Sequence, residues 1–255
     1  VVMLLSWFIS TEGLNDWGWR LGYIIGLVLA IAALMMRLSM PKSKAFEKLK
    51  ENDDLSETPV RSMLKKQRKP LFYAIALSTY GNVAYYLVLS YLETHFVELG
   101  YSQFFALSVV TVFSLLFAFT APLWGALSDL VGRKPLIKAA ILIYTFLSYP
   151  AFMLMNMGEY YLFLSVAILS VPLMLIWGSY GAAAPELFEA KYRYSGNALS
   201  YNVGNSFFGG TMPFLATLLI VVFGGVNAPA WLLIVSSLIM IPIIMSMPET
   251  RYREV

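Results

Sequence analysis

Seven apolar stretches are separated by connections, and connections that contain Lys or Arg alternate strictly with connections that contain neither. Each stretch is long enough for a helix to cross the hydrocarbon core of a bilayer, which takes about 20 residues. Of the 18 Lys and Arg residues, 17 fall on one side of the predicted membrane, and Arg20 alone falls on the other. Because cytoplasmic loops carry an excess of basic residues, this pattern predicts an integral membrane protein with its basic connections in the cytoplasm. The predicted spans are residues 20–39, 71–92, 102–124, 136–156, 160–182, 196–223 and 228–247.

The composition excludes several classes of function. The chain is 59% hydrophobic and 13% charged, whereas soluble domains are about 25% charged. The net charge of +3 lies in the cytoplasmic connections, so no nucleic-acid partner is expected. With no cysteine, a disulfide framework or a thiolate metal site is excluded. The single histidine, His95, is expected at an interface in an outer connection. We therefore expect no catalytic residues, no metal and no cofactor.

A long charged segment divides the chain. Residues 40–69 hold nine Lys and Arg and five acidic residues, and six spans follow. This layout is typical of a transporter built from two halves. Residues 1–10 are apolar but too short to cross a bilayer, and they are interpreted as the outer end of a helix whose start is missing. We predict the end of a first half at 1–39, a central cytoplasmic loop at 40–69, a six-helix bundle at 70–247 and a cytoplasmic tail at 248–255.

The connection between the third and fourth spans holds the pattern G-x-L-S-D-x-x-G-R-K. Gly125 and Gly132 permit a tight reversal of the backbone. Asp129 can accept hydrogen bonds from Arg133 or from a helix N-terminus, where negative charge is favoured. Together with Lys134, these residues are predicted to form a cytoplasmic gate. The alternative is a simple turn with basic anchors.

This pattern resembles the loop signature of the major facilitator superfamily, in its second-half copy. Further segments narrow the resemblance to the metabolite:proton symporter family, and within it to the proline/betaine-type osmolyte symporters. At Lys42, however, that family usually has an acidic residue. The segments that carry the resemblance are Trp17–Arg20, Pro185–Phe188, Arg193–Gly196, Tyr201–Pro213 and Pro248–Arg251.

The resemblance implies an all-α major facilitator fold of twelve helices, of which this chain holds the end of the fifth through the twelfth. It further implies proton-coupled symport of a small organic solute by alternating access. The expected partners are the solute, protons, the lipid bilayer and the missing N-terminal half, and the expected location is the plasma membrane, as a bacterial inner-membrane protein. Three alternatives stay open: a dicarboxylate or sugar proton symporter of the same superfamily, a seven-helix receptor, and a structural membrane subunit.

The candidates for solute contact are polar and aromatic, because no charged residue lies well inside the six spans after residue 70. The resemblance implies that the second, third, fifth and sixth spans of this chain line the cavity. Aromatic faces without a buried cation favour a zwitterion such as proline or betaine over a dicarboxylate. Asn and Tyr also hydrogen-bond between membrane helices, which is the alternative role. The candidates are Asn82, Tyr85, Tyr86, Trp177, Tyr180, Tyr201, Asn202 and Asn205.

Overall fold

The computed structural model describes residues 9, 13–39 and 59–251. The chain forms two compact units, residues 1–52 and 53–255. In the first unit, a π-helical turn, η1 (Leu14–Gly18), leads into α3 (Trp19–Ser39), which matches the first predicted span. The guanidinium of Arg20 lies 4.3 Å from the centre of the Trp19 ring, as expected of side chains at a membrane interface. The predicted helix remnant, apart from residue 9, and residues 40–58 of the predicted central loop lie outside the described residues.

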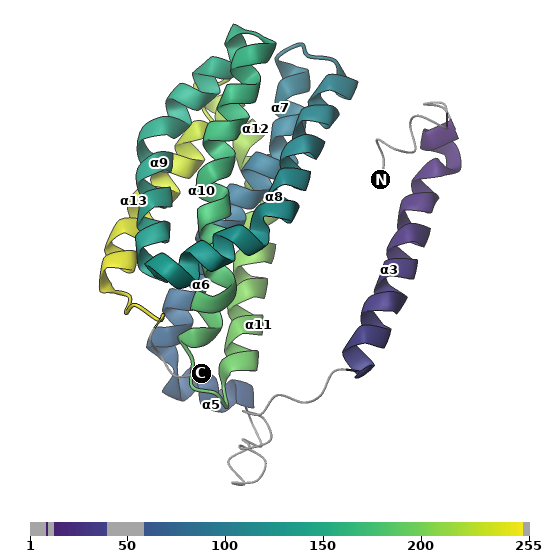
Figure 1. Cartoon of the computed structure of the whole chain (residues 1–255). Helices are drawn as coiled ribbons and strands as arrows, with labels where there is room; N and C mark the ends of the chain where they lie inside the picture. The colour runs from purple at the N-terminus through teal and green to yellow at the C-terminus, as the bar shows by residue number, and fades with distance from the viewer. Residues whose placement is uncertain (1–8, 10–12, 40–58, 252–255) are drawn as a thin grey trace. The chain divides into compact units, whose positions relative to one another are not determined.

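The second unit is a bundle of helices (Figure 1). Within the described residues it contains no strand. The rods Arg68–Glu98 and Arg193–Phe223 each change to π-helix part-way, and in the second rod two turn residues, Gly210 and Thr211, follow the π-helical segment. In chain order the elements are α5 (Pro59–Lys66), α6 (Arg68–Tyr85), η2 (Tyr86–Tyr91), α7 (Leu92–Glu98), α8 (Gln103–Val131), α9 (Arg133–Leu154), η3 (Met155–Met157), α10 (Glu159–Glu186), α11 (Arg193–Val203), η4 (Gly204–Gly209), α12 (Met212–Phe223) and α13 (Ala230–Ser246).

The predicted crossings correspond to these rods. Six helical segments of the described chain are long and apolar enough to span a membrane. The seventh, α13, has 17 residues, which is near the lower limit for a spanning helix of about 17. The all-α membrane fold predicted from hydropathy is therefore confirmed.

The connections are shorter than hydropathy predicted. Residues 93–98 belong to α7, and residues 125–131 belong to α8. Between α8 and α9 only Gly132 is non-helical, and its φ of +108° suits glycine. Hydropathy marks the part of a helix that lies in hydrocarbon, but the backbone stays helical beyond it because its hydrogen bonds continue to be made.

The prediction that His95 sits in an outer connection was wrong. His95 lies in α7 and is fully buried. Its ring centre is 5.8 Å from that of Tyr91 and 5.4 Å from that of Phe152. Neither ring nitrogen has a hydrogen-bond partner among the described residues. The histidine therefore packs as an aromatic side chain between α7 and α9.

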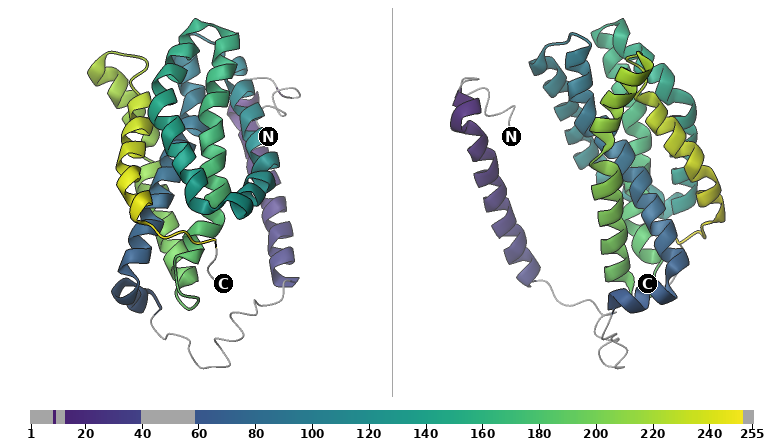
Figure 2. Two further views of the ribbon diagram at one scale, coloured as in Figure 1. Left: turned by 60° about the vertical axis from the view of Figure 1, so that its left-hand side comes forward. Right: turned by 180° about the vertical axis from the view of Figure 1, so that it is seen from behind.

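Helix α10 lies at the centre of the bundle, where it packs against α6, α8, α9 and α11. The Tyr144 hydroxyl of α9 donates to the Leu169 carbonyl of α10 over 2.9 Å. Helix α13 packs along α9 and α6, and Figure 2 shows its position from two further sides. The Tyr80 and Ser237 hydroxyls, 3.0 Å apart, join α6 to α13. We call the end of the bundle that carries α5, Gly132 and the end of α13 the basic end.

Two rods approach each other closely where α6 packs against η4. A Cβ atom added at Gly204 would lie 2.3 Å from the Ser78 Oγ and 2.7 Å from the Ser78 carbonyl carbon. A Cβ atom at Gly209 would lie 2.7 Å from the Tyr86 ring. Small residues at such positions let membrane helices approach backbone to backbone. The two glycines thus set the spacing of the rods that carry Asn82 and Asn205.

We predict that Gly204→Ala lowers the stability of the protein by about 1–3 kcal/mol, because the added methyl group forces the backbones of α6 and η4 apart. Thermal unfolding in detergent, followed by size-exclusion chromatography, measures the change. Gly181→Ala in α10 is the matched control, since nothing lies within 4 Å of an added Cβ there. Equal melting temperatures for the two variants would contradict the close approach.

Candidate functional site

A pocket of about 370 Å³ lies among the rods that contain α6, α8, α10 and α11. Its walls thus come from the second, third, fifth and sixth predicted spans. Its lining consists of three tyrosines, one tryptophan, one phenylalanine and two asparagines. The lining residues are Asn82, Tyr85, Tyr86, Phe117, Trp177, Tyr201 and Asn205.

The aromatic part of the pocket is organised around Trp177. The Tyr85 ring lies edge-on to it at 5.9 Å, and the Tyr201 ring at 6.4 Å. Phe117 meets Tyr85 from α8 at 6.3 Å. The indole N–H of Trp177 donates to the Gly81 carbonyl over 3.3 Å, which fixes the orientation of the ring. Edge-to-face arrangements are favoured between aromatic rings, and they leave ring faces free for a ligand.

Two amides supply the polar groups. The side-chain nitrogen of Asn82 donates to the Ser78 carbonyl over 2.9 Å and to the Ser78 hydroxyl over 3.3 Å. Because an amide NH₂ group has two protons, both donors of the buried Asn82 side chain are used and its Oδ1 is the remaining acceptor. The Asn205 amide makes no hydrogen bond to another side chain or backbone group in the part of the chain that the structure describes.

Six of the eight candidate residues thus line one pocket, and Tyr180 and Asn202 do not. Tyr180 lies behind the wall, with its ring 5.2 Å from Trp177 and 6.5 Å from Tyr201. Asn202 is exposed, and its amide donates to a carbonyl one turn earlier in α11. Sequence reasoning missed Phe117, because a phenylalanine in an apolar span carries no polar signal.

None of the lining side chains carries a formal charge. An anion of two carboxylates would want Arg or Lys close by, and the lining residues include neither. Aromatic faces and an amide oxygen instead suit a cationic group, which ring quadrupoles and acceptor dipoles attract.

The predicted gate motif forms a second site, a charged cluster at the basic end. Arg133 is 6% exposed and donates to the Asp129 carboxylate over 2.5 Å. It also forms a bidentate interaction with the Glu186 carboxylate at the end of α10, with N···O distances of 3.1 and 3.4 Å. The Thr250 hydroxyl donates to the same carboxylate over 2.6 Å. The cluster therefore joins α8, α9, α10 and the segment after α13.

Glu249 caps the start of α9. Its carboxylate accepts from the backbone N–H groups of Arg133 and Lys134, each over 3.0 Å. It also accepts from those of Thr250 and Arg251. Burial alone would raise the pKa of the Glu249 carboxyl, but these four donors outweigh it and hold the pKa below its ordinary value.

The structure corrects one expectation about the motif and adds a contact for Lys134. Gly125 does not take part in a reversal; it lies inside α8, with open space beside it. The turn is made by Gly132 alone. Lys134 does more than anchor the chain, because its ammonium donates to the Met245 and Met247 carbonyls at the end of α13.

Sequence reasoning also missed the acidic partners of the cluster, Glu186 and Glu249. Both follow a proline at the end of a predicted span, as Pro185-Glu186 and Pro248-Glu249. This repeated Pro-Glu pair opposite a basic connection was the signal that could have found them.

Comparison with known proteins agrees with this architecture. A model of the Major Facilitator Superfamily matches residues 1–196 and, in a second, overlapping match, residues 98–254. The chain belongs to the major facilitator superfamily. It is a multi-pass membrane protein, as the six candidate spans also indicate. No solved structure matches the chain.

Several curated relatives are named for the transport of proline, betaine or ectoine. The glycine betaine/proline/ectoine/pipecolic acid transporter OusA of Dickeya dadantii is 31% identical, over 94% of this chain and 50% of that protein. The ectoine/proline transporter ProP of Corynebacterium glutamicum is 28% identical, over 86% of this chain and 47% of that protein. The proline/betaine transporter of Salmonella typhimurium is 29% identical, over 99% and 53%. The chain thus spans about half the length of these relatives.

We predict that Glu249→Gln lowers stability at pH 7 by about 1 kcal/mol, as loss of a helix cap does. Because the pKa of Glu249 is lower in the folded protein than its ordinary value of 4.5, its contribution is present above about that pH and is lost as the pH falls through the folded pKa. The stability difference between wild type and variant should therefore shrink on acidification, as thermal unfolding measured between pH 7 and pH 3 would show.

Glu98→Gln serves as the control for this prediction. Glu98 is exposed at the opposite end of the bundle, and its pH-dependent difference from wild type should be smaller. A difference between wild type and Glu249→Gln that stays constant down to pH 3 would refute the charged cap.

Proposed function

We propose that the protein of which this chain is part takes up a zwitterionic osmolyte, such as proline or betaine, together with protons. The observation that carries this proposal is the uncharged pocket of aromatic rings and amides around Trp177. The names of the curated relatives support the same solute class.

The chemistry of the pocket supports a proposal for where the two ends of the solute bind. A quaternary or secondary ammonium group packs against aromatic faces with a gain of about 0.5–2 kcal/mol per ring. The Asn82 oxygen adds an acceptor dipole to the same wall. The carboxylate end needs hydrogen-bond donors or a cation, and we place these in the half of the transporter that precedes this bundle.

Proton coupling is proposed from membership of the superfamily and the resemblance to its proton symporters. The lining of the pocket contains no carboxyl or imidazole group. We therefore also place the group that carries the proton in the preceding half.

Transport would proceed by alternating access, in which this bundle rocks against the other half. The excess of Lys and Arg at the basic end supports an orientation with that end in the cytoplasm, and the bacterial relatives support an inner-membrane location. In this scheme the charged cluster around Arg133 is part of the cytoplasmic gate, and exposed Asp129 is the residue able to meet the other half.

Competition in the full-length transporter tests the solute class. Uptake of radiolabelled proline into proteoliposomes with an imposed proton gradient should be inhibited by betaine and not by succinate. If succinate competes and betaine does not, the osmolyte proposal is wrong. If uptake persists undiminished when the proton gradient is collapsed, the coupling is wrong.

We predict that Trp177→Leu in the full-length protein raises the KM for betaine by about twofold to thirtyfold, the loss of one cation–π contact. Trp177→Phe should recover part of the affinity, because a ring face returns. Trp231→Leu is the matched control, since Trp231 is half exposed on α13 and outside the pocket. A larger effect of Trp231→Leu on KM would rule out Trp177 as a contact.

We predict that Asp129→Asn shifts the conformational balance of the full-length protein and slows turnover without preventing insertion. The change removes the charge on an exposed residue that pairs with Arg133. Cysteine-accessibility labelling from the cytoplasmic side should report the shift. Glu93→Gln, at the opposite end of the bundle, is the control. Unchanged labelling and unchanged transport in Asp129→Asn would reduce the motif to a topological anchor.

A further inference from the structure

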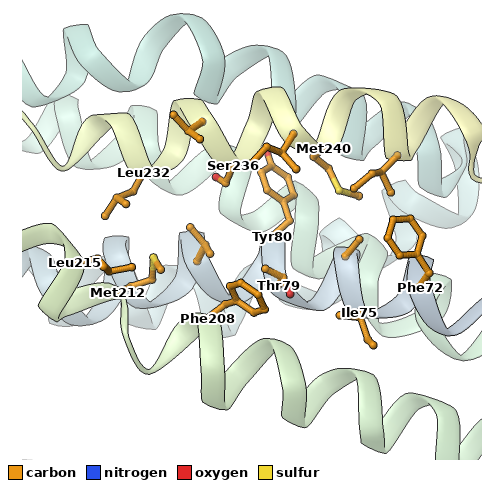
Figure 3. A pocket seen from close by; sticks show the side chains of 15 residues that line it. Phe72, Ile75, Thr79, Tyr80, Phe208, Met212, Leu215, Leu232, Ser236 and Met240 are labelled. Carbon is orange, nitrogen blue, oxygen red and sulfur yellow. The ribbon is translucent and has the colours of Figure 1, made fainter. Parts of the chain in front are cut away.

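A second and larger hollow lies on a different face of α6. It is a groove of about 500 Å³ between α6, α12 and α13. Figure 3 shows Tyr80 of α6 directed toward α13, with Phe72 at one end of the groove and Leu232 at the other. The lining is aliphatic and aromatic except for the hydroxyls of Thr79, Tyr80 and Ser236.

This groove is separate from the candidate solute pocket. On α6 it is lined by residues that recur every three or four positions from Phe72 to Val83, whereas the pocket uses Asn82 and Tyr85. At 100° per residue these two sets lie on different faces of the helix. The exposed side chains of its lining include Phe72, Val235 and Ile239, all of them apolar, which suits a helix surface in contact with lipid.

The dimensions fit one acyl chain. The lining of α6 runs from Phe72 to Val83, which at 1.5 Å per residue is about 17 Å of helix. One leaflet contributes about 15 Å of hydrocarbon, half of the bilayer core. The groove thus has the depth of a single leaflet and the apolar lining that a lipid tail requires.

A polar site lies beyond the end of the groove marked by Phe72. There a pocket of about 330 Å³ is lined by Lys69, Tyr73 and Ser246, among others. Lys69 lies three residues before Phe72, so both are on one face of α6. The Tyr73 hydroxyl donates to the Ser246 carbonyl over 3.0 Å and ties α6 to the end of α13 at this point.

The charge of this site is positive. Lys69 is exposed and makes no ion pair with any residue that the structure describes. Between residues 59 and 69 the chain has no acidic residue, while basic side chains follow one another along α5 and the start of α6. They are Arg61, Lys65, Lys66, Arg68 and Lys69. A phosphate group would be attracted here, at the depth where lipid headgroups lie.

We propose that this groove binds an anionic glycerophospholipid of the leaflet at the basic end, with one acyl chain between α6 and α13 and the headgroup phosphate at Lys69. The inference depends on the membrane fold and on charge, and it does not depend on the identity of the transported solute.

Photo-crosslinking in the full-length transporter tests this proposal. The protein is reconstituted in bilayers that contain either phosphatidylglycerol or phosphatidylcholine with the same diazirine in the acyl chain, and labelled peptides are mapped by mass spectrometry. We expect labelling concentrated on α6 and α13 around the groove, and about fivefold stronger with the anionic probe, the preference expected of one lysine near the surface. Labelling spread evenly over the exposed helices would overturn the groove as a lipid site, and equal labelling by both probes would overturn the headgroup site.

Two variants sharpen the test. Lys69→Gln should lower the preference for phosphatidylglycerol by about fivefold, whereas Lys138→Gln, on α9 and outside the groove, should leave the preference unchanged. Ala76→Trp should reduce labelling by both probes because it fills the groove. Val221→Trp, on a strongly exposed position of α12, should not. An undiminished anionic preference in Lys69→Gln, or undiminished groove labelling in a folded Ala76→Trp protein, would contradict the proposal.

Discussion

One buried guanidinium, that of Arg133, holds together the basic end of the bundle. A charge removed from water costs several kcal/mol unless it is paired, and Arg133 meets this requirement with Asp129 of α8 and Glu186 of α10. Glu249 completes the arrangement from the segment after α13. The ends of four helices are thereby fixed relative to one another. Two of these helices, α8 and α10, also carry Phe117 and Trp177 of the candidate solute pocket.

Much of this arrangement could be predicted from the sequence. The crossings follow from hydropathy, because a bilayer allows only helices whose backbone groups are satisfied internally. The polar and aromatic positions of the pocket stand out against apolar spans. Asn202 was misplaced because it is adjacent to Tyr201 in sequence but about 100° away around the helix. The helix ends were misjudged for another reason: polar residues such as Asp129 extend helices beyond the hydrocarbon, where hydropathy carries no information.

The separation of charge from the pocket connects the fold to the proposed function. Charged side chains gather at the helix ends, where they pair with one another, while the interior offers rings and amides. Such an interior can receive a solute whose own cation is satisfied by ring faces. The π-helical segments η2 and η4 lie where Tyr86 and Asn205 enter the pocket. Breaks of this kind are frequent at functional sites, and here they occur in the two rods that Gly204 and Gly209 bring into contact.

In the proposed function, the aromatic faces around Trp177 recognise the cationic group of the solute. This recognition can be tested with betaine and 3,3-dimethylbutanoate, which share shape and carboxylate and differ only in the replacement of the ammonium nitrogen by carbon. Binding of each to the full-length protein can be measured by isothermal titration calorimetry. We expect betaine to bind at least about tenfold more tightly, from the combined attraction of two or more rings. Equal affinities would show that the pocket recognises shape alone and would contradict the proposed recognition of the cation.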